Sequence, residues 1–204
     1  CSLVDLKKKN MKKTLLLTIA LLLSVTIFAQ NRSVLLRETF DSMSLPTGWT
    51  VSDNSTDNWS ISTTNRAGGE ANELKFSAEP KSVGTSRIIT TPIDLSGLST
   101  VTMSFRHFFD KKTYSAVIGI ATSSNNGQTW NAAWSQSYSE AGQYNVIASL
   151  KNNDMGKDNV LFCIYFQGNS TNINNWYFDD IEITSMEAID AKAQSIDLGD
   201  IIPA

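Results

Sequence analysis

One stretch decides the fold class of this chain: Trp176-Tyr177-Phe178-Asp179-Asp180-Ile181-Glu182-Ile183. Aromatic and β-branched residues dominate it, which is typical of a β-strand. Neighbouring strand residues point to opposite faces, so Asp179 and Asp180 do not share one solvent face. One of the two therefore faces the packed side, where an unpaired carboxylate is costly and a cation is a natural partner. The stretch predicts a β-sandwich that binds calcium beside this strand.

Further short apolar runs precede this strand, separated by clusters of Gly, Asn, Ser and Pro, and no helical periodicity of useful length accompanies them. This spacing predicts an all-β fold, a sandwich of two antiparallel sheets. The expected strands are Val34–Phe40, Trp59–Thr63, Ser86–Thr90, Thr100–Phe109, Tyr114–Thr122, Ala132–Tyr138, Tyr144–Ser149, Val160–Gln167 and Trp176–Thr184.

The N-terminal residues follow the order of a secretory signal peptide. A basic start at Met11-Lys12-Lys13 is followed by an apolar run over 15–28 and a cleavage junction at Ala29-Gln30. We therefore divide the chain into an upstream extension (1–10), a signal peptide (11–29), a β-domain (30–185) and an acidic tail (186–204). The tail is a linker, the start of a further domain or a disordered end.

Removal of residues 1–29 makes the chain clearly acidic. Five Lys and one Asp leave with them, so the 17 basic residues become 12 and the 20 acidic ones 19, a net charge of −7. Nucleic acids and anionic membranes both reward basic surfaces, which argues against either partner. The apolar run is also short for a membrane-spanning helix, so we expect no membrane insertion after cleavage.

The residues that most often carry catalysis are scarce. Cys163 is the only cysteine after the signal peptide, within the apolar run 160–166, and His107 is the only histidine of the chain. His107 shares the apolar parity of Phe105 and Phe109, which favours a hydrogen-bonded core histidine. A nucleophile and a base have no evident meeting place, so we expect no catalytic centre.

The segment Ser123-Ser124-Asn125-Asn126-Gly127-Gln128-Thr129-Trp130 predicts a tight hairpin. It resembles the Asp-box, with Asn in place of Asp. Asn side chains bond their own backbone in turns and Gly accepts positive φ, while the Trp folds back over the turn. The motif indicates local structure and no particular function.

Two other groups of residues admit a functional interpretation beside a structural one. Glu70 and Glu73 could form the carboxylate pair of a glycosidase, although acidic residues in a solvent-exposed loop are the commoner explanation. Trp59, Trp134 and Tyr138 are candidates for a sugar-stacking platform, although packing in the core or in a hairpin is the commoner explanation for each Trp.

The whole set of motifs resembles the cleaved-adhesin or choice-of-anchor J family, which is related in fold to MAM domains and to the adhesin domains of gingipain-type proteases. The resemblance covers about residues 34–185. It rests on the segments Glu38–Trp49, Thr90–Ser96, Ser104–His107, Gly127–Trp130 and Trp176–Ile181.

This resemblance implies a jelly-roll sandwich, secretion or surface display, and a calcium ion where the first and last strands meet. Carried over by motif, the metal ligands are Glu38 and Asp41 of the opening strand and the closing pair Asp179 and Asp180. We favour Asp180 as the inward ligand, because it shares parity with Trp176 and Phe178. The resemblance implies no catalytic residue.

The sequence thus predicts a secreted or surface-displayed, non-enzymatic adhesin-like module that binds an extracellular glycan or protein. The alternative is an accessory domain of a secreted peptidase or glycoside hydrolase whose catalytic part lies outside this chain.

Overall fold

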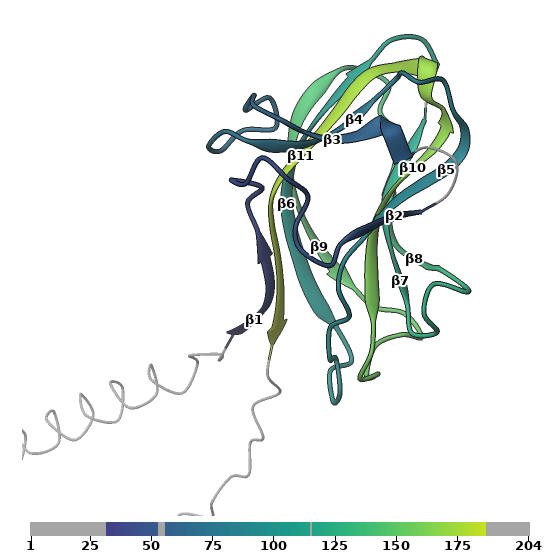
Figure 1. The fold of residues 1–204 in the computed structure, drawn as a ribbon. Helices are drawn as coiled ribbons and strands as arrows, with labels where there is room; N and C mark the ends of the chain where they lie inside the picture. The colour runs from purple at the N-terminus through teal and green to yellow at the C-terminus, as the bar shows by residue number, and fades with distance from the viewer. Residues whose placement is uncertain (1–31, 53–55, 115, 187–204) are drawn as a thin grey trace, which may run out of the picture. The chain divides into compact units, whose positions relative to one another are not determined.

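Two antiparallel β-sheets face each other in the computed structural model, which describes residues 32–52, 56–114 and 116–186 (Figure 1). The predicted signal peptide and tail lie outside these residues, apart from Met186. Within the described ranges, no helix has the length and hydrophobicity needed to cross a membrane.

The first sheet has six strands. Its order is β3 (Trp59–Ser62), β4 (Glu73–Ser77), β11 (Ile173–Met186), β6 (Val101–Lys111) and β9 (Gly142–Leu150), and β1 (Arg32–Glu38) also pairs with β11. The second sheet has five strands, in the order β2 (Thr50–Ser52), β5 (Val83–Ile89), β10 (Leu161–Asn169), β7 (Val117–Ser123) and β8 (Asn131–Gln136). Short 3-10 turns occupy Thr56–Asn58 and Ser170–Asn172.

The chain crosses repeatedly between the sheets. Among the described strands, two pairs that follow each other in sequence are also hydrogen-bonded neighbours in one sheet, β3 with β4 and β7 with β8. Every other connection passes from one sheet to the other. This confirms the predicted all-β jelly-roll sandwich. Each of the nine expected strands has a counterpart, whereas β2 and β4 were not predicted.

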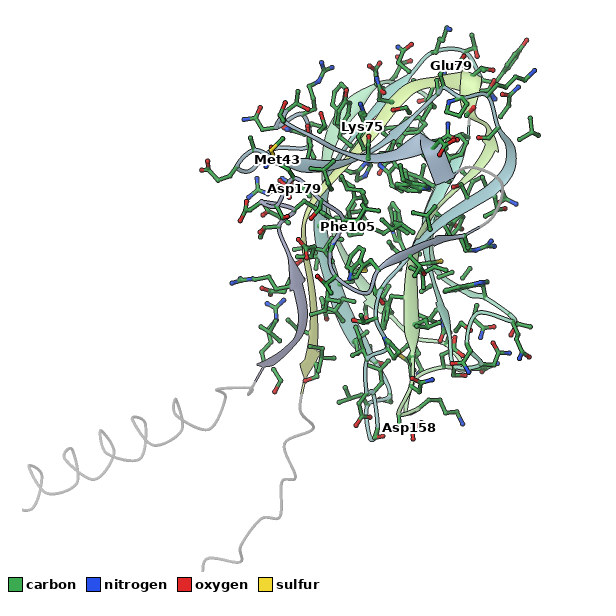
Figure 2. The ribbon with its side chains drawn as sticks, in the orientation of Figure 1. Met43, Lys75, Glu79, Phe105, Asp158 and Asp179 are labelled. Carbon is green, nitrogen blue, oxygen red and sulfur yellow. The ribbon has the colours of Figure 1, made fainter. Side chains whose placement is uncertain are left out.

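The core lies between the sheets and is rich in stacked aromatic rings. Phe105 of β6 stacks on Phe178 of β11 at 4.4 Å, and Phe76 of β4 stacks on Phe166 of β10 at 4.5 Å. Figure 2 shows Phe105 in the space between the two sheets. Such pairs bury large apolar areas, and this packing explains why the alternating apolar residues of the sequence form strands.

One edge of β11 is shared by two strands placed end to end. β4 pairs with the first half of β11, from Asn175 to Phe178, and β1 pairs with the second half, from Ile181 to Met186. In Figure 1, β1 runs beside the lower part of β11 while β3 and β4 cross near its upper part. The predicted neighbourhood of the first and last strands is therefore present.

Candidate functional site

A gap between β1 and β4 lies beside the middle of β11, and we call it the notch. Its residues on β11 are Asp179 and Asp180, because the β4 register ends at Phe178 and the β1 register begins at Ile181. The opening of the sheet edge thus coincides with the two adjacent carboxylates. Figure 2 shows Asp179 near the loop that carries Met43.

A β-bulge follows Asp179 and contains Asp180. On the β6 side, Asp179 pairs with Arg106 and Glu182 with Ser104, so two residues of β11 oppose Phe105 alone. The extra residue, Asp180, has a φ of 51°. A bulge reverses the alternation of faces beyond it. The interpretation from parity was wrong, because Asp180 is partly exposed. Asp179 pairs with the exposed Arg106 and so lies on the outer face of the sheet, yet it is only 1% exposed because the loop that carries Gly69 covers it.

Burial raises the pKa of Asp179 to about 7, and the nearby carboxylates of Asp180, Glu73 and Asp41 add to this effect. A hydrogen bond from the Asp180 amide to Asp179 Oδ1, at 2.7 Å, acts in the opposite direction. The site therefore holds a carboxylate whose ionised form is unfavourable without a nearby positive charge.

The two aspartates of the notch converge on Gly69. A Cβ at this position would lie 2.8 Å from Asp180 Oδ2 and 2.9 Å from Asp179 Oδ2, so only glycine leaves the space between these oxygens open. Asp180 Oδ2 also lies 2.8 Å from Arg106 Nε. This donor set of carboxylate oxygens suits a hard cation such as calcium better than zinc.

The other two predicted ligands make local bonds instead. Glu38 Oε1 accepts a bond from the Phe40 amide at 2.7 Å, and Asp41 Oδ2 accepts one from the Thr39 hydroxyl at 2.8 Å. In the described part of the chain, no three His, Cys, Asp or Glu side chains group so that they could hold a metal ion. Of the four predicted ligands, Asp179 and Asp180 are the two whose carboxylates converge, beside Gly69, and a metal ion there would need backbone carbonyls or water as further ligands.

Glu73 is neither a solvated loop charge nor half of a glycosidase pair. It begins β4 and is fully buried. Its carboxylate accepts bonds from the Thr64 hydroxyl and from the amides of Arg66 and Ala67. These bonds tie down the loop that carries Gly69, whereas Glu70 is exposed.

An open groove of about 450 Å³ adjoins the notch on the outer face of the six-stranded sheet. Its lining includes Arg37, Ser104, Arg106, Asn145, Ile147 and Glu182. Arg37 donates a hydrogen bond to Glu182 at 2.7 Å, and Arg106 pairs with Asp180. These ion pairs orient the two guanidinium groups along the groove. Ile147 is 81% exposed and adds an apolar surface. Sequence reasoning missed this groove because its residues come from four separate strands.

The predicted aromatic platform does not form. Trp59 is buried in the core, 4.9 Å from Phe76 between ring centroids. Trp134 packs edge-on against Phe105, and Tyr138 stacks on Tyr144 at 3.9 Å. The structural explanation is therefore correct for all three residues.

His107 and Cys163 are also core residues. His107 is fully buried, with Nδ1 accepting a bond from Trp176 Nε1 at 3.3 Å and Nε2 lying 3.1 Å from the Tyr138 hydroxyl. Burial lowers the pKa of His107 to about 4, so it is neutral at pH 7. Cys163 is 1% exposed on β10, in the other sheet. These positions agree with the core roles expected for both.

The fold is similar to those of several solved structures. The K1 cleaved adhesin domain of Lys-gingipain from Porphyromonas gingivalis W83 matches with a TM-score of 0.57 and 14% identity, covering 75% of this chain and 97% of that one. The K3 domain of the same protein matches with a TM-score of 0.55 and 18% identity, covering 75% and 100%. These matches confirm the predicted resemblance to cleaved adhesin domains at the level of the fold.

A third similar structure contains carbohydrate-binding and catalytic modules. It is the Clostridium thermocellum endo-1,4-β-D-xylanase 10B, CBM22-1 and GH10 modules, complexed with xylohexaose. The TM-score is 0.53 and the identity 13%, and the match covers 74% of this chain and 28% of that one. No family model and no curated protein matches the sequence.

Proposed function

We propose that this chain is an exported, non-catalytic binding module that takes a glycan in the groove beside the notch. The groove is the observation that carries the proposal. Arg37, Arg106 and Asn145 offer hydrogen-bond groups along it, and ion pairs hold the two arginines before a ligand arrives. Such pre-orientation lowers the entropy lost on binding. The similarity to adhesin and carbohydrate-binding domains supports the same function.

The charges of the groove favour a neutral or weakly charged glycan. Arg37 and Arg106 are balanced by Glu182 and Asp180, so the lining has no large excess of either sign. Hydroxyl groups match such a mixture of donors and acceptors, and the exposed Ile147 can contact the apolar face of a sugar ring.

A glycan array with the exported form of the chain tests this proposal, with xylohexaose as a probe for direct titration. Asn145 is exposed, so Asn145→Ala should weaken binding without lowering the melting temperature. Binding to a protein ligand with no glycan bound would overturn the glycan assignment.

A second candidate is an accessory domain of a secreted enzyme. One observation favours it: the similar xylanase structure joins modules of the two kinds in one chain, and this chain covers only 28% of it. A peptidase or glycoside hydrolase domain in the same reading frame would support this candidate.

We also propose a structural calcium ion at the notch, held by Asp179 and Asp180. Support comes from the buried Asp179 carboxylate, the raised pKa of Asp179 and the convergence of both carboxylates beside Gly69. A bound cation would offset the cost of the buried Asp179 charge, which Arg106 does not contact as it contacts Asp180.

A further inference from the structure

A second recess lies on the opposite face of the domain, on the outer side of the five-stranded sheet. It has a volume of about 170 Å³, and its lining includes Trp130, Tyr165, Arg87, Gln167, Ala121 and Ala132. It shares no residue with the groove or the notch. Its volume suits a single ring better than an extended chain.

The register of the sheet explains why a hollow forms here. Ala121 of β7 pairs with Ala132 of β8, so two small side chains lie side by side and form the floor of the recess. Their small size leaves space above the sheet. Tyr165 of β10 lies directly opposite Gly119, where a Cβ would be 2.5 Å from the ring carbon Cζ. Glycine at this position thus allows the tyrosine ring to lie flat over the neighbouring strand and form one wall.

The Asp-box turn supplies the other wall. Ser123 Oγ accepts a bond from the Gly127 amide at 2.9 Å, and Asn125 Oδ1 accepts one from the Thr129 amide at 3.0 Å. These bonds fix the hairpin that the sequence predicted and place Trp130 at its end. The Arg87 guanidinium lies 5.6 Å from the Trp130 ring centroid, so a cation–π contact helps to hold this wall.

Polar groups border the apolar floor. Arg87 is opposite Tyr165 in the sheet register, and Thr85 is opposite Gln167, so guanidinium, amide and hydroxyl groups surround the hollow. An apolar side chain placed here would leave these groups without new hydrogen bonds. A pyranose ring offers an apolar face for the aromatic walls and hydroxyls for the border.

The geometry points to a second carbohydrate site, a one-ring pyranose subsite between Trp130 and Tyr165 that is independent of the groove. The full chain should be titrated with the methyl glycosides of xylose, glucose, galactose and N-acetylglucosamine, followed by saturation-transfer NMR. We expect at least one of them to bind, with saturation passing from the protein to the protons of the sugar ring and lost in Trp130→Ala.

Two variants test the location. Ala132→Leu fills the floor from an exposed position, and Trp130→Ala removes one wall; each should weaken glycoside binding about tenfold or more. The matched control Ala141→Leu makes the same change at an exposed alanine outside the recess and should bind like the unchanged chain. A melting curve identifies any variant that fails to fold, and Ala132→Leu remains informative if Trp130→Ala does not fold.

The inference is overturned if none of the four glycosides binds, or if Ala132→Leu binds as well as Ala141→Leu does. Xylohexaose binding that is weakened only by Asn145→Ala would support the groove and leave the recess without a role. Glycoside binding weakened only by Ala132→Leu, with no glycan taken up by the groove, would support the recess and contradict the proposed function.

Discussion

The buried carboxylate of Asp179 is the residue on which the proposed metal site depends. Its pKa is about 7 in the folded state, against 3.8 in the unfolded chain. The carboxyl group therefore loses its proton less easily when the chain is folded. A raised carboxyl pKa stabilises the fold at low pH, and this stabilisation is lost as the pH rises through 7. Calcium would reverse the loss by favouring the ionised form.

We predict that Asp179→Asn stabilises the chain in EDTA at pH 8, by up to about 4 kcal/mol, because the neutral amide avoids the cost of the buried charge. The amide oxygen can still accept the bond from the Asp180 amide. Calcium should then raise the melting temperature of the unchanged chain and leave that of Asp179→Asn unaltered.

Asp158→Asn is the control for this experiment. Asp158 is exposed and lies at the other end of the domain (Figure 2), so its replacement should preserve the calcium response. An unchanged melting temperature in calcium and in EDTA would show that Asp179 is a hydrogen-bonded structural residue without a metal.

His107 predicts a pH dependence of the opposite sign. Its folded-state pKa is about 4, against 6.5 in the unfolded chain, so the unfolded chain binds a proton first as the pH falls. The stability contributed by neutral His107 is complete above pH 6.5 and is lost between 6.5 and 4.

We therefore predict that the stability difference between the unchanged chain and His107→Gln shrinks by about 3 kcal/mol from pH 7 to pH 4. Urea unfolding at several pH values measures it. Taking the difference between the two proteins cancels the opposing contribution of Asp179. A difference that does not depend on pH would contradict the buried, neutral state of His107.

At the scale of single elements, the strands were predictable where the apolar pattern is long and were missed where it covers only a few residues. β6 and β10 carry long apolar patterns and appear close to their expected ends. β4 has the sequence Glu-Leu-Lys-Phe-Ser and follows a glycine-rich loop. It contains only two apolar residues, and Glu73 at its start is of a type that is common in loops, so the strand was missed. Three-residue β2 is too short to show a period.

The candidate site was predictable only in part, for a related reason. The carboxylate pair in an aromatic strand indicated that one of the two charges would be buried, and Asp179 is buried. The bulge at Asp180 could not be seen, since it depends on how β6 pairs with β11 across a long sequence separation. The groove and the recess also arise from register between distant strands, which one sequence does not specify.

Another buried carboxylate joins several elements of the second sheet. Asp154 accepts bonds from Thr122 Oγ1 at 2.6 Å, Ser124 Oγ at 2.7 Å and Asn131 Nδ2 at 2.9 Å. Burial alone would raise the pKa of Asp154, but together these bonds and one from the Ser124 amide lower it.

We predict that Asp154→Ala destabilises the fold by about 2–4 kcal/mol at pH 7, because several donors lose their acceptor together. Asp158→Ala, in the same loop but exposed, should cost almost nothing. Denaturant unfolding of the two variants measures both effects, and equal stabilities would show that the Asp154 network contributes little.

At the scale of the whole molecule, the sandwich presents two separate surfaces. The groove lies on the outer face of the six-stranded sheet and the recess on the outer face of the five-stranded sheet, so they point in opposite directions. The core between them is filled with aromatic side chains and holds both surfaces at a fixed separation. If both proposed sites bind, one molecule presents them to two glycans on opposite sides.

We predict that the chain links two populations of beads, one coated with xylohexaose and one with the methyl glycoside that binds the recess. Each linkage requires both faces of one molecule, so Asn145→Ala and Ala132→Leu should each reduce the number of mixed clusters, while each variant keeps binding through its intact face. Multivalent contact makes clustering more sensitive than single-site titration, since weak contacts reinforce one another on a bead surface. Microscopy of differently dyed beads gives the readout, with Ala141→Leu expected to cluster them normally. Mixed clusters that are as numerous with Ala132→Leu as with Ala141→Leu would show that one face, or self-association of the chain, is sufficient for linkage.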